Sequence, residues 1–466
     1  MDDFRQQAHR IADWIADYLE HSETYPVLSG VAPGSIRAAL PVSAPEHGEP
    51  FEAIWADFER IVLPGITHWN HPGFFGYFAI TGSAPGVLAE FLCAALNVQA
   101  MLWRTSPAAT ELEEVTLGWL RSLLRLPDTF EGVIYDTASI STLHALAAAR
   151  EAALPDVRGG GLAGRSDVPR VRVYCSEHAH SSVDKAVMLL GLGRSALRRI
   201  PADAQFRMDP RQLETAIGDD RRAGILPLAV VATVGTTSTT SVDPVDAVAA
   251  ICSGERLWLH VDAAYAGVAA MVPGWEWIFD GVSAADSVVV NPHKWLFTPF
   301  DCSVLYCRRM DTIRQAFSLT PEYLLTREAG VRNLMDTGIQ LGRRFRALKL
   351  WMVLRHFGAN GLRERIAEHM RLARLFAEWV DASDRFELAA PVPFSVVCFR
   401  LRQDHSDEAH QRVLDEVNRS GEVFLSHTKL DGRYAFRLAI GHLRSAEPHI
   451  RRAWQLLNLA ADNSTV

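Results

Sequence analysis

Lysine is scarce in this sequence. Of its 47 basic residues 43 are arginines, and the only lysines are Lys185, Lys294, Lys349 and Lys429. Arginine stays protonated under physiological conditions, whereas a lysine amine can lose its proton and act as a nucleophile. Any chemistry that depends on a lysine amine therefore has only four candidate residues.

Other features are missing as well. The six cysteines are scattered and form no CxxC pair, which predicts reduced, mostly buried thiols and argues against a disulfide framework or a metal site. The net charge of −8 argues against a nucleic-acid partner. No apolar run is long enough to span a bilayer, and the first residues lack a signal-peptide pattern, so we expect a cytoplasmic protein without a membrane partner.

The chain is long enough for two or three domains. We predict an N-terminal helical and extended dimerisation segment (1–81), a large α/β domain (82–345) and a small C-terminal α+β domain (346–466). Residues 4–19 place apolar side chains on one helical face, which needs either a partner subunit or the same chain to cover it.

The middle of the chain alternates between helical patterns and short apolar runs. These runs lie at 132–135, 171–174, 228–234, 257–261 and 287–291. Continuous apolar runs between helices predict a mostly parallel sheet that is buried on both faces. Ligands bind such sheets at the carboxyl ends of the strands.

Polar residues follow each of the five runs. The hydroxyls and backbone N–H groups at 137–139 suit a phosphate site, although on these residues alone an ordinary helix cap at Ser139 is the better explanation. His178 and His180 follow the second run, as polar loop residues or as ligands. Thr236 follows the third run and Asp262 the fourth, where a buried carboxylate needs a cation or a capping role. The fifth run ends at Asn291, directly before His293 and Lys294.

One cofactor uses all of these positions. Pyridoxal phosphate needs a phosphate site at a helix start, a carboxylate that faces its ring nitrogen, and a lysine that holds it as a Schiff base. Lys294 is the only one of the four lysines that directly follows a core strand. A GxGxxG match at 159–164 lacks the strand–turn–helix context of a dinucleotide site, so we interpret it as a flexible connection.

Several longer motifs resemble one enzyme family over nearly the whole chain. They are TSPAATELE, AHSSVDKA, ATVGTTSTT, HVDAAYAG, NPHKWL and LGRRFRALKLW. The sequence resembles the group II pyridoxal-phosphate decarboxylases, most closely the aromatic-L-amino-acid decarboxylases. HVDAAYAG followed by NPHKWL is the most specific part of this resemblance.

The resemblance implies a role for each matching residue. Lys294 matches the Schiff-base lysine, Asp262 the partner of the pyridine nitrogen, and His180 the histidine stacked over the cofactor. Tyr323 matches the loop tyrosine that protonates Cα after carbon dioxide leaves. The remaining cofactor contacts are expected at Thr137, Ala138, Ser139, Thr236, Ala264, Asn291 and His293.

The resemblance also implies a fold, an assembly and a pocket. The fold is the aspartate-aminotransferase type (fold type I), an α/β architecture that forms homodimers with active sites at the subunit interface. Met101 and Leu102 match residues inserted from the second subunit. The expected aromatic pocket consists of Trp69, Tyr77, Phe78, Phe300 and the two positions Ile80 and Gly342.

Two positions depart from the family pattern. Asp136 precedes the phosphate stretch, where an acid would repel the anion, so it should point away or cap the helix. Ile80 replaces a threonine of the relatives that handle catechols, and burying a ring hydroxyl without a partner costs roughly 1–3 kcal/mol. With Gly342 leaving room for a wide ring, we expect tryptophan or phenylalanine to be preferred over tyrosine and dihydroxyphenylalanine.

The expected reaction is decarboxylation of an aromatic L-amino acid to its amine. One alternative is oxidative decarboxylation and deamination to an aldehyde, which in this family accompanies loss of the loop tyrosine or the stacking histidine; both residues are present here. A second alternative is a homologue that binds the cofactor without catalysis.

Overall fold

The structure is a computed structural model that describes residues 2–154, 156–319, 328 and 330–463. Contacts within the chain define two compact units. The large unit contains Ile80–Arg374 with Ala390–Cys398, and the small unit contains Met1–Ala79, Leu375–Ala389 and Phe399–Val466. The three-part division expected from the sequence stays a prediction.

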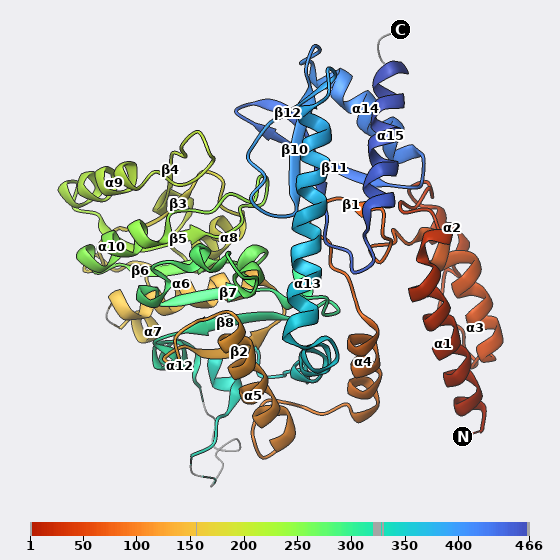
Figure 1. Cartoon of the computed structure of the whole chain (residues 1–466). Coiled ribbons are helices and arrows are strands. Elements are labelled where there is room, and N and C mark those ends of the chain that lie inside the picture. The colour runs from red at the N-terminus through yellow and green to blue at the C-terminus, as the bar shows by residue number, and fades with distance from the viewer. Residues whose placement is uncertain (1, 155, 320–327, 329, 464–466) are drawn as a thin grey trace. The chain divides into compact units, whose positions relative to one another are not determined.

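The large unit is built on a seven-stranded sheet with the order β2-β8-β7-β6-β5-β3-β4 (Figure 1). The strands are β2 (Glu131–Tyr135), β3 (Val171–Ser176), β4 (Leu197–Ile200), β5 (Leu226–Thr233), β6 (Trp258–Asp262), β7 (Ser287–Val290) and β8 (Ser303–Cys307). Only β8 runs against its neighbours, β2 and β7. The mostly parallel sheet is therefore confirmed.

The sequence pattern identified five of the seven strands. It did not single out β4 and β8. Arginines at 198 and 199 interrupt the apolar pattern of the edge strand β4. β8 follows β7 without an intervening long helix, because an antiparallel neighbour does not require a crossover.

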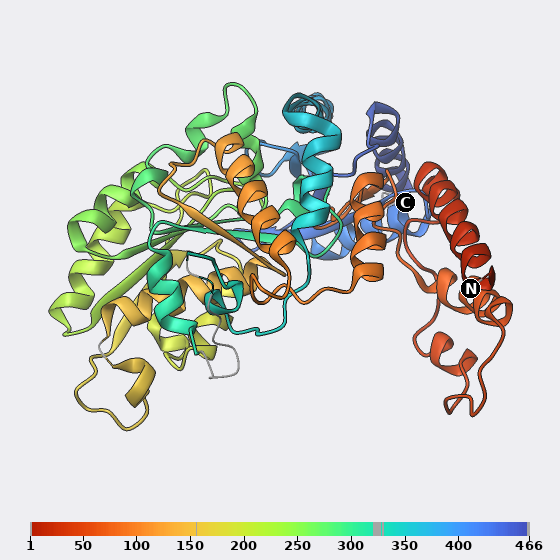
Figure 2. The same cartoon turned by 90° about the horizontal axis from the view of Figure 1, so that it is seen from below.

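Helices cover both faces of this sheet, which Figure 2 shows from its side. Helix α6 (Ala138–Ala153) contacts five strands of the sheet, and α8 (Ser182–Leu189) and α12 (Met310–Phe317) pack against α6. The small side chains of Ala147, Ala148 and Ala149 are almost completely buried, so α6 can approach its neighbours closely. The other helices are α4 (Ala84–Leu96), α5 (Pro107–Leu123), α7 (Val157–Gly160), α9 (Pro210–Arg222), α10 (Val245–Glu255) and α11 (Pro292–Trp295).

The small unit has its own sheet, with strands β1 (Phe74–Phe75), β9 (Phe386–Leu388), β11 (Phe424–Leu430) and β12 (Arg433–Ala439); β10 (Val396–Leu401) and α13 (Ala347–Asp381) extend from one unit into the other. Strands β11 and β12 form an antiparallel pair, and α14 (Asp407–Arg419) and α15 (Glu447–Asn463) complete the C-terminal part.

The N-terminal helix α1 (Asp2–His21) packs on its own chain, and Ile11, Ile15 and Leu19 of its predicted apolar face are half-buried. Trp14 stacks on Tyr18 and meets Trp55 edge-on, whereas Phe4 is 76% exposed. The expected extended linker after α1 is interrupted by α2 (Ser35–Ala39), and α3 (Phe51–Asp57) follows it. Within the described ranges, we find no helix that is both long and apolar enough to cross a membrane.

A buried ion pair between Arg343 and Glu113 holds the backbone of β2 at Ile134. Arg343 donates to Glu113 Oε1 at 3.0 Å and to the Ile134 carbonyl at 2.7 Å, and Glu113 Oε1 also accepts the Ile134 N–H at 2.9 Å. Both charged side chains are less than 10% exposed. Since the two charges satisfy each other and the backbone of β2, removal of either one leaves the other uncompensated.

We therefore expect Glu113→Ala to lower the free energy of unfolding by about 3–5 kcal/mol, the range for breaking a buried ion pair. Urea denaturation followed by circular dichroism measures this change. Glu214→Ala, at an exposed position on α9, is the control. Equal effects of the two substitutions would show that the buried ion pair does not contribute to the free energy of unfolding.

Candidate active site

The carboxyl ends of β2, β3, β5, β6 and β7 meet at one edge of the large unit's sheet. The segments that follow these strands contain all of the expected cofactor contacts. The α/β topology therefore brings together residues that lie more than 150 positions apart in the sequence, from Thr137 to Lys294.

His180 lies within electrostatic range of two other ionisable side chains at this edge, Asp262 and Lys294. The pKa of His180 is lowered, first because the surrounding protein desolvates the imidazole; the Asp262 carboxylate opposes this shift, and the Lys294 ammonium adds to it. His180 is nevertheless exposed, and its Nδ1 accepts the Ser182 N–H at 3.1 Å. A largely neutral imidazole therefore faces the space beside Asp262 and Lys294.

Asp262 is the last residue of β6 and is only 6% exposed. Its Oδ1 accepts the Ala264 N–H at 3.1 Å, and it forms no ion pair with any residue that the structure describes. Burying a carboxylate without a cation is costly. The site therefore suits a ligand that brings a protonated nitrogen to this strand end.

Thr236 lies in a tight turn after β5. Its Oγ1 accepts the Ser241 N–H at 3.0 Å and lies 3.0 Å from the Thr239 hydroxyl, so its position is fixed by the turn itself. Gly235 precedes it with φ +91°, and a Cβ there would come within 2.6 Å of Ala266. A side chain at 235 would displace the turn that presents Thr236.

The N-terminus of α6 offers free backbone donors. The N–H groups of Ala138 and Ser139 have no hydrogen-bond partner among the described residues, and Thr137 is the N-cap without a side-chain cap bond. Such donors at the start of a 16-residue helix, together with its dipole, form an anion site. Asp136 turns back instead, and its Oδ1 accepts the N–H of Thr137 at 2.6 Å.

Asn291 adds a side-chain donor to the same site. His293 Nδ1 accepts the Cys302 N–H at 2.9 Å, and burial lowers the pKa of His293 to about 3, so the neutral ring carries its proton on Nε2. That proton faces the Asn291 amide at 3.3 Å, which requires the amide oxygen on that side. The NH₂ group then occupies the other side of the amide, where the buried atom has no partner.

Lys294 lies in the one-turn helix α11, whose N-cap is Asn291. Its side chain is half-buried. The next residue, Trp295, is completely buried and stacks on Tyr265 with ring centroids 4.8 Å apart. This stacking holds α11 against the segment that follows β6, and thereby holds Lys294 near Asp262.

A buried hydrogen-bonded chain lies below Asp262, and the sequence did not reveal it. His260, two residues earlier on the same face of β6, has Nδ1 2.9 Å from Ser287 Oγ and Nε2 3.4 Å from Thr142 Oγ1. Trp258 Nε1 donates to Ser287 Oγ at 3.0 Å. The chain links β6, β7 and α6, the three elements that present Asp262, Lys294 and the anion site.

The expected pocket residues form separate groups. In the small unit, Trp69 stacks on Tyr77 at 5.7 Å, and the ring of Phe78 lies under the Arg437 guanidinium. In the large unit, Met101 and Leu102 pack with Met335 of their own chain, and the Phe300 ring lies 4.8 Å from the ring of His293.

Two further positions complete the large unit's set. Ile80 is half-buried, and Gly342 lies against Gln99, whose amide nitrogen would be 3.1 Å from an added Cβ. No three His, Cys, Asp or Glu side chains in the described part of the chain form a group that could hold a metal ion.

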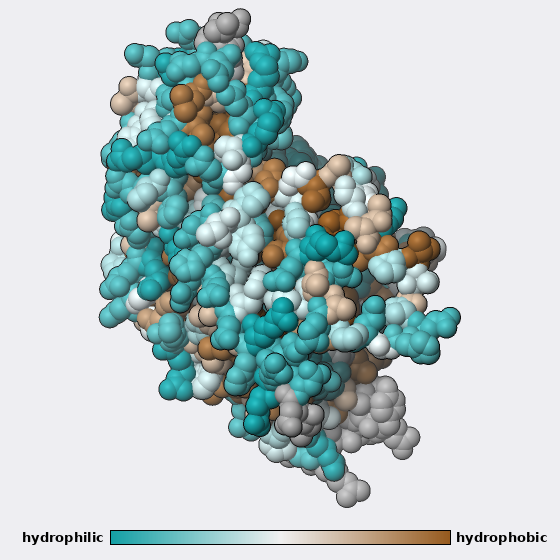
Figure 3. Space-filling view, turned by 90° about the vertical axis from the view of Figure 1, so that its right-hand side faces the viewer, coloured by the Kyte–Doolittle hydropathy of each residue, from teal (hydrophilic) through white to brown (hydrophobic). Residues whose placement is uncertain are grey.

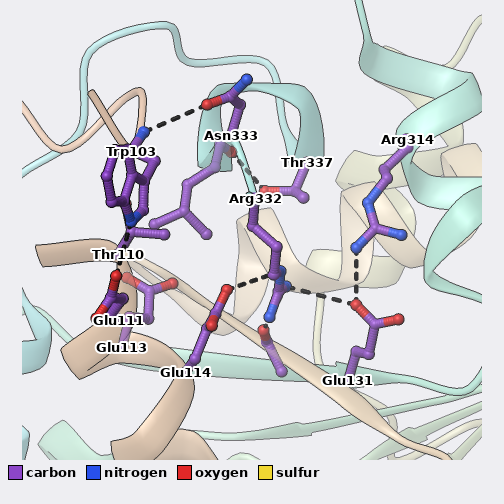
Figure 4. A network of polar contacts seen from close by, with 12 residues as sticks. Trp103, Thr110, Glu111, Glu113, Glu114, Glu131, Arg314, Arg332, Asn333 and Thr337 are labelled. Carbon is purple, nitrogen blue, oxygen red and sulfur yellow. Dashed lines mark hydrogen bonds and ion pairs between the residues drawn. The ribbon is translucent and has the colours of Figure 1, made fainter. Parts of the chain in front are cut away.

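Tyr323 lies outside the described residues. The segment after it is anchored by a polar network (Figure 4). Arg332 pairs with Glu114 and Glu131 at 3.6 Å each and donates to the Gly132 carbonyl at 3.2 Å, while Asn333 accepts the Trp103 N–H at 3.3 Å. These contacts tie the residues after position 330 to α5 and β2.

Comparison with known proteins explains this arrangement. Residues 33–402 match the pyridoxal-dependent decarboxylase conserved domain. The chain belongs to the pyridoxal-dependent decarboxylase family. It is 39% identical to an aromatic-L-amino-acid decarboxylase of Catharanthus roseus, over 99% of this chain and 94% of that protein. It is 40% identical to a phenylacetaldehyde synthase of Arabidopsis thaliana, over 97% and 94% of the two chains.

A solved structure of the family is equally similar. The crystal structure of Oryza sativa TDC with PLP and tryptamine has a TM-score of 0.95 and 38% identity, and the similarity covers 99% of this chain and 98% of that one. The expected fold class, fold type I, and the cofactor, pyridoxal phosphate, are thereby confirmed. The free donors of α6, the Asn291 amide and the unpaired Asp262 carboxylate fit the phosphate and ring nitrogen of this cofactor.

His260 also makes the protein sensitive to acid. Burial lowers its pKa to about 4, so below pH 6.5 the unfolded chain binds a proton that the folded chain does not. Between these limits His260 lowers the free energy of unfolding by up to about 1.4 kcal/mol per pH unit as the pH falls.

We expect His260→Gln to make the free energy of unfolding less dependent on pH between pH 6.5 and 4. The slope against pH should fall by up to about 1.4 kcal/mol per pH unit, which corresponds to one proton fewer taken up on unfolding. Chemical denaturation of the protein at a series of pH values measures the slope. His47→Gln, at an exposed position, should leave the slope unchanged. An unchanged slope in the His260 variant would contradict a neutral buried imidazole.

Proposed function

We propose that this chain removes the carboxyl group of an aromatic L-amino acid as carbon dioxide and releases the corresponding amine. The buried Asp262 carboxylate, which forms no ion pair with a described residue and shares one sheet edge with His180 and Lys294, is the observation that carries the proposal. The similar proteins include an aromatic-L-amino-acid decarboxylase of Catharanthus roseus, and Oryza sativa TDC with PLP and tryptamine has the same fold, which supports the proposal.

We propose the following roles for the chain's residues. Lys294 holds the cofactor through its amine until the substrate amine replaces it, and Asp262 keeps a proton on the ring nitrogen. Bound pyridoxal phosphate supplies an electron-accepting ring for the electrons that remain when carbon dioxide leaves. His180 covers the ring and orients the substrate carboxylate, and Tyr323 donates a proton to Cα.

The remaining contacts hold the cofactor in place. We propose that the first turn of α6 and Asn291 bind its phosphate, that Thr236 contacts its edge, and that Ala264 packs on the ring. Asp136 does not compete with the phosphate, because its carboxylate is occupied by the Thr137 N–H and hydroxyl.

The substrate's side chain is proposed to be an unsubstituted aromatic ring. Relatives of similar identity include a tryptophan decarboxylase of Camptotheca acuminata and a tyrosine decarboxylase of Narcissus pseudonarcissus, so family membership alone does not select the ring. Ile80 offers no hydrogen-bond partner for a ring hydroxyl, and Gly342 contributes no side chain. Both favour tryptophan or phenylalanine over dihydroxyphenylalanine.

We also propose that the chain forms a homodimer. Helix α4 exposes Leu88, Leu92 and Leu96 at intervals of four residues, by 58%, 49% and 59%, which gives an uncovered apolar stripe. Phe4 of α1 is exposed as well. Figure 3 shows one face of the molecule, where hydrophobic side chains are exposed among mostly hydrophilic ones.

Oxygen-dependent conversion to an aldehyde is the second candidate, because a phenylacetaldehyde synthase is among the similar proteins. The presence of both His180 and Tyr323 favours simple decarboxylation. The deciding experiment quantifies carbon dioxide, amine, aldehyde, peroxide and ammonia from each of the twenty amino acids with the holoenzyme. Equal amounts of carbon dioxide and amine support the proposal, aldehyde with peroxide supports the oxidative route, and no product would indicate a non-catalytic homologue.

Asp262→Ala should nearly abolish turnover without unfolding the protein. Loss of a buried charge partner costs about 3–5 kcal/mol, which corresponds to roughly two to four orders of magnitude in kcat if the loss falls on the transition state. Steady-state amine release measures it, with Asp280→Ala, at an exposed position, as the control. Near-normal turnover in the Asp262 variant would remove this residue from the mechanism.

Ile80→Thr should raise kcat/KM for dihydroxyphenylalanine relative to tryptophan. A hydroxyl partner for the ring removes a penalty of roughly 1–3 kcal/mol, which is about five- to 150-fold. Ile80→Val is the matched control, because the valine side chain has nearly the same shape as threonine but lacks the hydroxyl. If both variants change the ratio equally, the effect comes from side-chain size rather than from hydrogen bonding.

A further inference from the structure

The large unit has a second pocket at the opposite edge of its sheet, where β6 and β7 begin and β8 ends. Its volume is about 240 Å³. Three arginines, Arg256, Arg308 and Arg309, line it together with the single carboxylate of Asp286. None of these residues belongs to the candidate active site.

The positive charge in this pocket exceeds what the protein itself neutralises. Arg308 Nη2 and Arg309 Nε lie 3.2 and 3.1 Å from the same oxygen, Asp286 Oδ1. The other oxygen, Oδ2, accepts the Leu259 N–H at 2.9 Å. Arg256 forms no ion pair with any described residue, so the pocket lining contains three guanidinium groups and one carboxylate, which only two of them contact.

Two of the guanidinium groups are held in place before any ligand arrives. Arg309 lies over the Trp258 ring at 4.5 Å from its centroid, and Arg308 donates to the Ala284 carbonyl at 3.2 Å. Arg256 follows α10 as its left-handed C-cap, with φ +58°. Each of these arginines is exposed, so their remaining N–H groups can donate to a ligand from the solvent side.

A simpler explanation is that the arginines only neutralise Asp286. One buried carboxylate needs one cation, whereas here two arginines contact it and a third stands beside them without an acid. Like charges that share a pocket repel one another. An anion with several oxygens would remove this repulsion and accept from more than one guanidinium, as phosphate does.

We propose that this pocket binds a small phosphate-class anion, inorganic phosphate or the phosphate group of an ester, at a site separate from that of the cofactor. A carboxylate has two oxygens and is matched by one guanidinium fork, whereas a tetrahedral phosphate presents oxygens to donors from three directions. The proposal does not depend on which amino acid the enzyme decarboxylates.

Isothermal titration of the holoenzyme with inorganic phosphate tests the proposal, at ionic strength held constant with sodium chloride. The cofactor site is kept filled, and the absorbance of the bound cofactor is monitored to show that phosphate does not displace it. We expect saturable binding of one phosphate per chain, and binding of acetate or succinate at least tenfold weaker. Tighter binding of succinate would overturn the assignment to the phosphate class.

Arg256→Gln removes one guanidinium that forms no ion pair in the described protein, so the fold should survive. We expect it to weaken phosphate binding at least tenfold while amine release stays unchanged. Arg194→Gln, at another exposed arginine of the large unit without a described ion pair, should bind phosphate as the unaltered protein does. Absence of saturable binding, or equal effects of the two substitutions, would overturn the proposal.

Discussion

The carboxylate of Asp262 is buried at the end of a strand and forms no ion pair with a described residue, and the rest of the candidate active site is arranged around it. A buried charge of this kind is tolerated only where a ligand completes it. His180, which follows β3, interacts electrostatically with Asp262 and with Lys294, which follows β7. The parallel sheet produces this convergence, because its strands end at one edge.

Polar contacts beneath the site hold the strand ends in register. His260 contacts β7 through Ser287 and α6 through Thr142, so one buried chain joins the strand that ends at Asp262 to β7 and α6. Arg343 and Glu113 fix the β2 backbone just before the anion site. Both sets of contacts are buried. They therefore depend on a neutral His260 imidazole and on the ion pair between Arg343 and Glu113.

Much of this was predictable from the residues themselves. The five apolar runs became β2, β3, β5, β6 and β7, and Lys294 was selected because it alone among four lysines follows a core strand. The patterns did not single out β4 and β8, since charge interrupts one and the other needs no crossover. The His260 chain was also not predictable, because Thr142 and Ser287 are ordinary hydroxyl residues until the fold brings them together.

The sequence by itself determined the element types, the family and the chemistry available, because apolar periodicity and the motifs HVDAAYAG and NPHKWL are local properties of the chain. Only the tertiary structure decided which polar groups remain without partners. Whether Asp262 has a cation, which way the Asn291 amide faces and how many arginines share Asp286 all depend on residues distant in sequence. Such long-range pairings between particular polar side chains arise only when the fold brings them together, and they leave no periodic signal in the sequence.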